Sequence, residues 1–355
     1  MKPFEHLKIV ELASVLAGPS VGLFFAELGA KVLKIENKKA GGDVTRSWKL
    51  ASEDQDHPFS AYYSSVNWGK ESWMLDLKDT AEREKLTYEL AHADVIIANF
   101  KPGDAEQLQL DFQSIKKINP IAIYGEITGF GSEKRTAYDV VLQAESGFLS
   151  MNGTSDGELC KMPVALIDIL AAHHLKEGLL LALLEHQKTP KSIKVSVSLY
   201  DAALASLANQ ATNWLMGKHV AQPMGTLHPN IAPYGELFTC ADKKQIVLAI
   251  GSNDQFSKLC EVLKSSELSS DKRYLSNQAR VLNRIILAES LAAVISKFKR
   301  EELIQLLISQ QVPAGAVRNM EEVFETPQSQ NRLIHSKKEG REIISVKGNA
   351  FEISY

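Results

Sequence analysis

The sequence predicts an α/β fold built on a mostly parallel sheet. Three observations support this prediction: strand-like apolar segments alternate with helix-like segments along the first half of the chain, turns containing glycine follow several of the strands, and residues 94–98 are almost continuously apolar. Such alternation is typical of a parallel sheet whose two faces are covered by helices. The chain has 355 residues, of which 45% are hydrophobic, and this is enough for two domains.

The N-terminal elements form a predicted βαβ unit. Residues 7–12 and 31–36 predict strands, and residues 19–28 predict a helix with Pro19 at its first position. A nicotinamide-binding unit would need three closely spaced glycines in the first turn, but only Gly18 stands there, so a dehydrogenase is disfavoured. The remaining elements of this half are predicted as strands at 73–77, 94–98, 121–127 and 194–197, and as helices at 80–91, 112–118, 140–146 and 199–216.

A segment rich in proline and glycine, residues 222–234, marks a domain boundary. Beyond it the pattern predicts a smaller α+β domain. Its elements are predicted as a hairpin of residues 235–240 and 245–250, helices at 255–263, 280–298 and 301–309, a strand at 312–317, and a final strand pair within 342–355. The predicted layout is a large domain at 1–216, a linker at 217–234, a small domain at 235–320, and a return segment at 321–355 with a short C-terminal tail.

Composition and charge disfavour several classes of function. The formal net charge of −3 gives no basic surplus for nucleic acid or for a membrane surface. The N-terminus has no apolar signal core, and the longest apolar run, residues 175–184, contains charges and is too short to span a bilayer. Cys160, Cys240 and Cys260 are far apart, so we expect no metal site, no disulfide framework and a cytoplasmic location.

Asp168 is the most informative carboxylate in the sequence. It follows a short apolar segment, residues 162–167, and precedes a helix rich in Leu and Ala that is predicted at 169–184. Local sequence favours an N-cap, which accepts hydrogen bonds from the first free amides of that helix. A second interpretation is a nucleophilic carboxylate that the positive end of the helix dipole keeps ionised. The two roles are compatible.

Several short motifs occur in one order along the chain. They include Val15-Leu16-Ala17-Gly18-Pro19, Gly42-Asp43, Asn99-Phe100-Lys101-Pro102-Gly103, Gly129-Phe130-Gly131, Ser198-Leu199-Tyr200-Asp201-Ala202 and His228-Pro229-Asn230. Each motif is weak alone, but the ordered set, from about residue 7 to about residue 317, resembles the family III CoA-transferases, which include formyl-CoA and carnitine-CoA transferases. The resemblance implies a Rossmann-like large domain, a smaller domain, and an interlocked homodimer in which each chain threads through a hole in the other.

The resemblance also implies an activity and a site. Asp168 matches the nucleophile that forms an aspartyl-CoA thioester while CoA passes from an acyl-CoA to a small carboxylic acid, without a metal. For CoA, the resemblance assigns Val15, Leu16 and Ala17 to the thiol end, Leu75, Asp76, Leu77 and Lys78 to the nucleotide, Asn99 and Phe100 to the adenine with Lys101 after them, and Tyr138 and Asp139 to the thioester. Arg135 is among the nearby cations available for phosphate.

Some positions depart from the family pattern and leave alternatives open. Asn37 and Gln107 stand where formyl-CoA transferase has arginines for phosphate, so one alternative is a CoA-binding homologue without catalysis. The other is an α-methylacyl-CoA racemase, which needs an acid–base pair across the α-carbon. That branch has a His-Asp pair and a glutamate where this sequence has Tyr138-Asp139 and Asn253, so transfer is favoured over racemisation.

Overall fold

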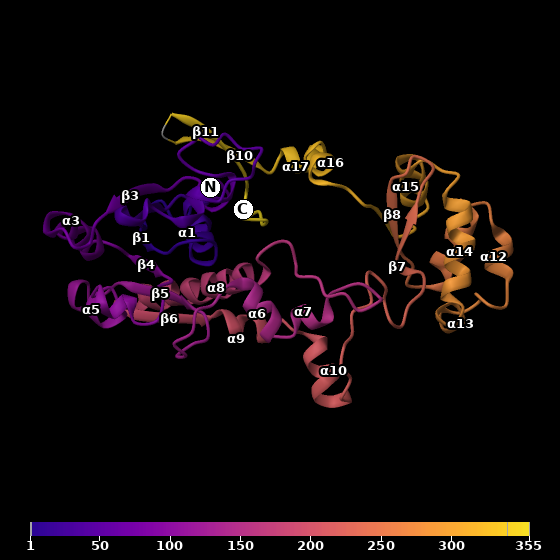
Figure 1. Cartoon of the computed structure of the whole chain (residues 1–355), viewed down its shortest axis with the longest axis horizontal. Coiled ribbons are helices and arrows are strands. Elements are labelled where there is room, and N and C mark those ends of the chain that lie inside the picture. The colour runs from indigo at the N-terminus through magenta and orange to yellow at the C-terminus, as the bar shows by residue number, and fades with distance from the viewer. Residues whose placement is uncertain (1, 339, 355) are drawn as a thin grey trace. The chain divides into compact units, whose positions relative to one another are not determined.

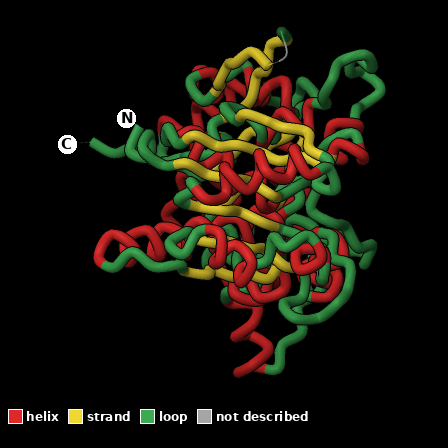
Figure 2. Tube along the Cα trace, turned by 90° about the vertical axis from the view of Figure 1, so that its left-hand side faces the viewer, coloured by secondary structure: helices red, strands yellow, loops and turns green. Residues whose placement is uncertain are grey.

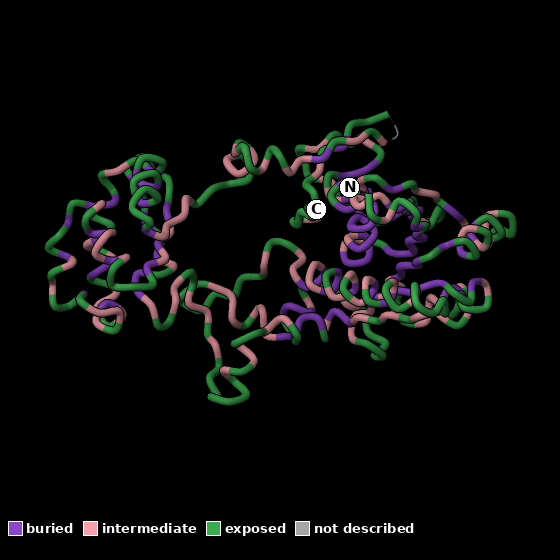
Figure 3. Tube along the Cα trace, turned by 180° about the vertical axis from the view of Figure 1, so that it is seen from behind, coloured by how far each residue is buried: buried purple, intermediate pink, exposed green. Residues whose placement is uncertain are grey.

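The computed structural model describes residues 2–338 and 340–354, which form two compact units (Figure 1). The larger unit takes in the chain up to residue 149, residues 161–220, and the chain from residue 331 onward. The smaller unit comprises residues 150–160 and 221–330. Each unit has buried core residues of its own, drawn in purple in Figure 3.

A six-stranded parallel sheet organises the larger unit, and its strands stack in the order β3-β2-β1-β4-β5-β6 (Figure 2). The strands are β1 (Lys8–Leu12), β2 (Lys31–Asn37), β3 (Glu71–Leu75), β4 (Val95–Ala98), β5 (Ile123–Thr128) and β6 (Ile193–Ser198). Strand β1 lies between β2 and β4, with Ile9 in register with both Val32 and Val95. The strand order therefore reverses beside β1, and in open parallel sheets ligands bind at the carboxyl ends of the strands at such a point. The predicted α/β class is confirmed.

Helices cover both faces of this sheet. The helices of the larger unit are α1 (Ala17–Glu27), α2 (Ala61–Val66), α3 (Thr80–Ala91), α4 (Asp104–Gln107), α5 (Phe112–Ile118), α6 (Asp139–Glu145), α8 (Leu166–Lys188), α9 (Leu199–Ala205) and α10 (Asn209–Gly217), with the 3₁₀ helices η1 (Lys38–Ala40) and η2 (Val44–Ser47). Because side chains alternate along a strand, Val95 and Ile97 of β4 pack into one core with α1 and α8, whereas Ile96 packs into a second core with α3 and α5.

A C-terminal hairpin returns to the larger unit. It consists of β10 (Leu333–Lys338) and β11 (Arg341–Val346), which pair antiparallel. Ile343 is buried with Phe59 and with Tyr63 of α2, so this hairpin is held by apolar burial against the segment before β3. The final strand pair predicted within 342–355 is wrong in position, since its first strand begins at Leu333; the predicted end, Tyr355, lies outside the described residues.

The smaller unit is α+β. Its antiparallel sheet has the order β7-β8-β9, formed by β7 (Tyr234–Thr239), β8 (Gln245–Ala249) and β9 (Ala314–Ala316). Its helices are α11 (Asn253–Val262), α12 (Ser266–Ser270), α13 (Asn277–Leu282), α14 (Arg284–Ile295), α15 (Arg300–Ser309), α16 (Met320–Phe324) and α17 (Pro327–Gln330), and α7 (Phe148–Met151) lies where the chain first enters this unit. Ile246 and Leu248 of β8 pack with Leu291 and Leu303 in its core.

Some predicted boundaries are confirmed and others are wrong. The helices predicted at 80–91 and 112–118 have those bounds. The helix predicted at 199–216 is two helices, α9 and α10, because Ala208 has a φ of 48° and left-handed backbone interrupts a right-handed helix. The helix predicted at 280–298 divides at Asn283, whose side-chain amide donates to the Ala279 carbonyl and competes with the helical pattern. Pro19 is the third residue of α1, not the first.

Candidate active site

A pocket of about 500 Å³ lies at the carboxyl ends of β1, β2, β3 and β4. This is the edge of the sheet at which parallel α/β proteins bind their ligands. Seven of the residues that the resemblance assigned to CoA line this pocket, and they come from the segments after β3 and β4: Leu75, Asp76, Leu77, Lys78, Asn99, Phe100 and Lys101. The topology thus brings together two segments that are more than twenty residues apart in the sequence.

The pocket is lined by four lysines and by four residues with carboxylate side chains, so charges of both signs face it. Lys39, Lys78 and Lys101 line it, and Lys39 forms an ion pair of 2.9 Å with Asp76. Within residues 2–338 and 340–354 no ion pair occupies the ammonium group of Lys78 or Lys101. Asn37 accepts a hydrogen bond from the Lys39 amide and caps η1. Lysines such as Lys78 and Lys101 at the edge of a pocket suit a phosphate ligand.

Asn99 ties the end of β4 to the loop that follows β1. Its Oδ1 accepts a hydrogen bond of 2.9 Å from the Ser14 amide, and its Nδ2 donates a bond of 2.8 Å to the Ser14 carbonyl. The loop continues through Val15, which has a φ of 70°. Leu16 and Ala17 then begin α1. Val15, Leu16 and Ala17 are not among the residues that line the pocket. The Val15 amide donates a hydrogen bond to Asp43, which does line it, so Val15 lies next to the pocket wall.

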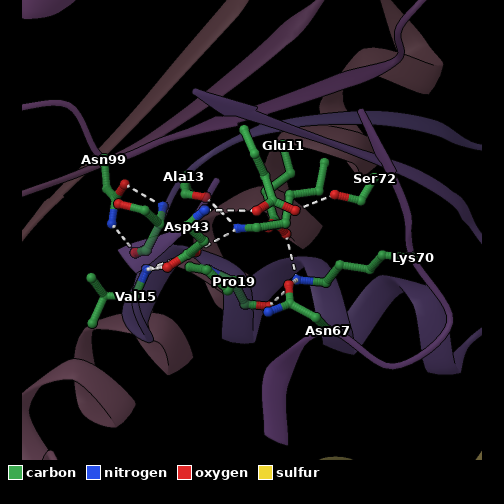
Figure 4. Close-up of polar contacts among 12 residues, drawn as sticks. Glu11, Ala13, Val15, Pro19, Asp43, Asn67, Lys70, Ser72 and Asn99 are labelled. Atoms are coloured by element: carbon green, nitrogen blue, oxygen red, sulfur yellow. Dashed lines mark hydrogen bonds and ion pairs between the residues drawn. The ribbon is translucent and has the colours of Figure 1, made fainter. Parts of the chain in front are cut away.

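A cluster of buried charges lies beneath this loop (Figure 4). Lys34 forms ion pairs of 3.1 Å with Glu11 and 3.0 Å with Asp43, and Lys70 forms an ion pair of 2.7 Å with Glu11. Burial lowers the pKa of Lys34, but the carboxylates of Glu11 and Asp43 outweigh burial and raise that pKa above its usual value. Burial lowers the pKa of Lys70 to about 8.

Asp168 is the third residue of α8, and only 8% of its surface is exposed. The N-cap interpretation is wrong, because Ala165 is the N-cap and the helix begins at Leu166. The second interpretation expected the helix dipole to keep the carboxylate ionised. Instead, burial and then the charge of Asp139 raise the pKa of Asp168 to about 7, since removal from water and a like charge both disfavour the ionised form.

Asp139 begins α6 and holds the start of α8 in place. Its Oδ1 accepts a hydrogen bond of 2.7 Å from the backbone amide of Ile167, and its Oδ2 accepts one of 2.6 Å from Gln143. Ile167 is fully buried in the core, so the position of Asp168 is fixed from two sides. Asp139 therefore orients the candidate nucleophile and adds to the effect of burial on its pKa.

Tyr62 is a site residue that sequence analysis missed. It belongs to α2, is half-buried, and contacts Trp48 edge-to-face with ring centroids 5.2 Å apart. Burial raises the pKa of its phenol, and the carboxylates of Asp168, Asp139 and Asp43 raise it further. The Tyr62 phenol is therefore close enough to feel the charge of Asp168, Asp139 and Asp43. Of these three residues, Asp43 lines the pocket.

Arg135 and Tyr138 do not line the pocket. Asp139 and Asp168 are not among its lining residues either. The Arg135 guanidinium stacks over Phe130 at 4.0 Å and donates a hydrogen bond of 2.9 Å to Glu145. Tyr138 is the N-cap residue of α6, and its side chain is exposed. Their assigned roles with phosphate and thioester remain predictions.

No group of three or more His, Cys, Asp or Glu side chains in the described residues is arranged to hold a metal ion. The helices of residues 2–338 and 340–354 include none with the length and apolar character needed to cross a membrane. Cys160, Cys240 and Cys260 are free thiols.

A parallel sheet with a pocket at the carboxyl ends of its strands defines an α/β protein of the class that binds its ligands at this edge. The chain belongs to CoA-transferase family III, whose model matches residues 4–355, so the resemblance is confirmed and the chain is an enzyme of this family. It is 36% identical over 338 residues to the succinate–glutarate CoA-transferase of Agrobacterium fabrum, an alignment that covers 93% of this chain and 84% of that one.

Two further relatives support this assignment. The human succinyl-CoA:glutarate CoA-transferase is 34% identical over 92% of this chain and 74% of its own length. Among solved structures, a CaiB/BaiF family protein from Brucella suis is 35% identical and superposes with a TM-score of 0.88, covering 99% of this chain and 93% of its own.

Proposed function

We propose that this chain moves CoA from an acyl-CoA to a small carboxylic acid, with Asp168 as the nucleophile. The observation that carries the proposal is a carboxylate in the first turn of α8 that is nearly withdrawn from water and fixed beside Asp139. A carboxylate is a weak nucleophile in water because it is strongly hydrated. Burial removes that hydration, which favours attack on a thioester held next to it.

The pocket supplies a binding site for the nucleotide end of CoA in this proposal. Leu75, Leu77 and Phe100 offer apolar surface, and the cations Lys78 and Lys101 are available to the phosphates. In this proposal the two lysines bind the phosphates in place of the arginines that formyl-CoA transferase has at the positions of Asn37 and Gln107. A non-catalytic CoA-binding role would leave the placement of Asp168 unexplained.

The reaction proceeds through two kinds of covalent intermediate. The Asp168 carboxylate attacks the thioester carbon, the carbon–sulfur bond breaks, and a mixed anhydride and the CoA thiolate result. The thiolate then attacks the Asp168 carbonyl carbon, which releases the donor acid and leaves an aspartyl-CoA thioester. The acceptor acid attacks this thioester and the same steps run in reverse, so that Asp168 is restored as a carboxylate.

Dicarboxylic acids are the substrates that we propose. The similar proteins named above are called succinate–glutarate and succinyl-CoA:glutarate CoA-transferases, and a relative from Acetobacter aceti, 32% identical over 99% of this chain and 89% of its own length, is called acetyl-CoA:oxalate CoA-transferase. The proposal therefore takes succinyl-CoA as donor and glutarate as first acceptor. A cytoplasmic homodimer, interlocked as in the family, belongs to the same proposal.

Racemisation is the less favoured alternative. It needs proton donors on both faces of the α-carbon, and the aligned residues are the Tyr138 phenol and the Asn253 amide. Asn253 accepts a hydrogen bond from Arg280 through its Oδ1 and carries no proton that titrates near neutral pH.

A transfer assay tests the proposal. Purified protein is incubated with succinyl-CoA and glutarate, oxalate or mesaconate, and the new CoA thioesters are separated and identified. We expect glutaryl-CoA from the natural sequence and loss of transfer by at least about 1,000-fold in Asp168→Ala, because no other group can take over a covalent step. Transfer at an undiminished rate by that variant would remove Asp168 from the mechanism.

A further inference from the structure

The loop between β1 and α1 has an unusual backbone at Val15. Its φ of 70° lies in the left-handed region, which is unfavourable for a β-branched residue. Backbone strain of this kind persists only where surrounding contacts hold it. The contacts that hold this loop and the start of α1 come from four side chains distant in the sequence: Lys34, Asp43, Lys70 and Asn99.

Asp43 makes the contact that bears directly on the strained residue. Its Oδ2 and Oδ1 accept hydrogen bonds of 3.2 Å and 3.4 Å from the Val15 amide (Figure 4). The Oδ1 atom also accepts bonds of 3.0 Å from the Thr45 amide and 2.8 Å from the Thr45 hydroxyl. The carboxylate is 95% buried, and these bonds fix its orientation.

Lys34 supplies the charge that allows a carboxylate at this buried position. Its ammonium group lies 3.0 Å from Asp43 Oδ2 and donates a bond of 2.6 Å to the Ala13 carbonyl, two residues before Val15. Lys70 donates a bond of 2.8 Å to the Pro19 carbonyl in the first turn of α1, just after the loop. An ion pair of this kind is costly to break from one side, because the remaining charge stays buried without its partner.

We propose that Asp43 is a positioning residue for the transfer reaction. It fixes the Val15 amide, and with it the path of residues 15–17, at the place where the thiol end of CoA meets Asp168. This inference rests on the proposed function, because the role of residues 15–17 toward the thiol end is part of it. The carboxylate of Asp43 also contributes to the raised pKa of Tyr62 together with that of Asp168, which supports its proximity to the reacting groups.

The substitution Asp43→Asn tests this role, since it keeps the shape of the side chain and removes the charge. Misplacement of a reacting group by about 1 Å is enough to lower kcat about 100-fold. We expect kcat to fall about 10- to 100-fold in this variant, while KM for succinyl-CoA changes less than about 3-fold because Lys78 and Lys101, the proposed phosphate contacts, are unchanged. A merely structural role would lower the fraction of active protein and leave kcat per folded site unchanged.

Val15→Gly provides the second arm of the test. Glycine adopts a positive φ without strain, so the loop in this variant depends less on Asp43. The loss of kcat caused by Asp43→Asn should therefore be at least about 3-fold smaller in the Val15→Gly background than in the natural sequence. Equal losses in the two backgrounds would contradict the inference.

Two further variants keep the result interpretable. Asp111→Asn is the matched control, because Asp111 also holds two backbone amides, those of Gln113 and Ser114, at the start of α5, and we expect its kcat to stay within about 2-fold of the natural value. If Asp43→Asn does not fold, Thr45→Val removes one bond from the carboxylate and should lower kcat about 3-fold. A natural kcat in Thr45→Val would then overturn the inference.

The assay with Asp168→Ala separates the two proposals. Loss of transfer in Asp168→Ala together with a natural kcat in Asp43→Asn rejects the positioning role alone. Undiminished transfer in Asp168→Ala rejects the proposed function, whatever Asp43→Asn does.

Discussion

Asp139 accepts a hydrogen bond from the backbone amide of Ile167, the residue before Asp168, at the start of α8. The pKa of Asp168 is raised to about 7 by burial and, in second place, by this neighbouring charge. The helix dipole, which favours a carboxylate at this end of a helix, is the weaker effect. The candidate nucleophile is therefore about half protonated near neutral pH.

The rate of transfer should depend on pH because only ionised Asp168 attacks the thioester. A profile of kcat/KM between pH 5 and 9 is expected to rise through a midpoint near 7 and then level off, since this parameter reports the ionisation of the free enzyme. A flat profile across this range would contradict the raised pKa.

Removal of the neighbouring charge should move this midpoint. Asp139→Asn can still accept the bond from the Ile167 amide, but it no longer repels the ionised form of Asp168. We expect the midpoint of kcat/KM to shift to lower pH by less than about 2 units, because burial is the larger cause and remains. Glu133→Gln, an exposed carboxylate on the loop before α6, serves as the control and should leave the midpoint where it is. A midpoint that stays near 7 in Asp139→Asn would show that Asp139 does not set it.

Asp168 should lower the stability of the fold at alkaline pH. Its pKa is about 7 in the folded chain, against an ordinary value of 3.8 for an aspartate in water, so the folded state prefers the protonated form. Its contribution to stability is present below pH 3.8 and is lost as pH rises through 7. Asp168→Asn avoids this loss and should raise the free energy of unfolding at pH 8 by up to about 4 kcal/mol, and by much less at pH 4.

Urea unfolding of both proteins at pH 4 and pH 8 measures this difference. Asp111→Asn should show the opposite sign at pH 8, since hydrogen bonds from Ser114 and the neighbouring amides outweigh burial and hold the pKa of Asp111 below its usual value. Equal stabilisation of Asp168→Asn at the two pH values would mean that the carboxyl group is not perturbed by the fold.

The lysines of the pocket should govern affinity for the nucleotide of CoA. Lys101→Ala is expected to raise KM for succinyl-CoA about 5-fold with kcat nearly unchanged, and Lys78→Ala should do the same, because each removes one charge-assisted contact to phosphate. The effect should shrink at 0.5 M salt. Lys116→Ala, at an exposed position on α5, is the matched control.

An acyl-pantetheine substrate provides the second readout for these lysines, because it lacks the nucleotide. With this substrate Lys101→Ala and the natural sequence should have equal kcat/KM. A loss of the same size with both substrates would place Lys101 outside the phosphate site.

The sheet could be predicted from the sequence because its evidence is local. The segment that forms β4 is short and continuously apolar, which is typical of a buried parallel strand. Helix α3 begins after the N-cap residue Asp79, which marks its start in the sequence. The break at Ala208 could not be predicted, since a positive φ at an alanine is imposed by tertiary contacts rather than by propensity. The start of α8 was placed too late because Leu166 and Ile167 continue an apolar segment that has no strand periodicity.

The pocket residues were within reach of sequence analysis for a different reason. Leu75–Lys78 and Asn99–Lys101 follow strands, and the family motifs identify them one by one. The motifs assigned no role to Glu11, Lys34 or Asp43, although Asp43 belongs to the motif Gly42-Asp43. The one sequence signal for this cluster is that Glu11 lies inside β1 and Lys34 lies inside β2. Both strands are buried, and a buried charge requires a partner. The partner itself becomes evident only when the strands are paired.

The central claim is a covalent bond between CoA and Asp168, and mass spectrometry of the protein after brief incubation with succinyl-CoA tests it most directly. We predict a CoA adduct on the peptide that contains Asp168, formed within one turnover, removed by added glutarate as glutaryl-CoA appears, and absent from Asp168→Asn. Rapid formation of glutaryl-CoA with no adduct on that peptide, or with an adduct on another residue, would contradict the account.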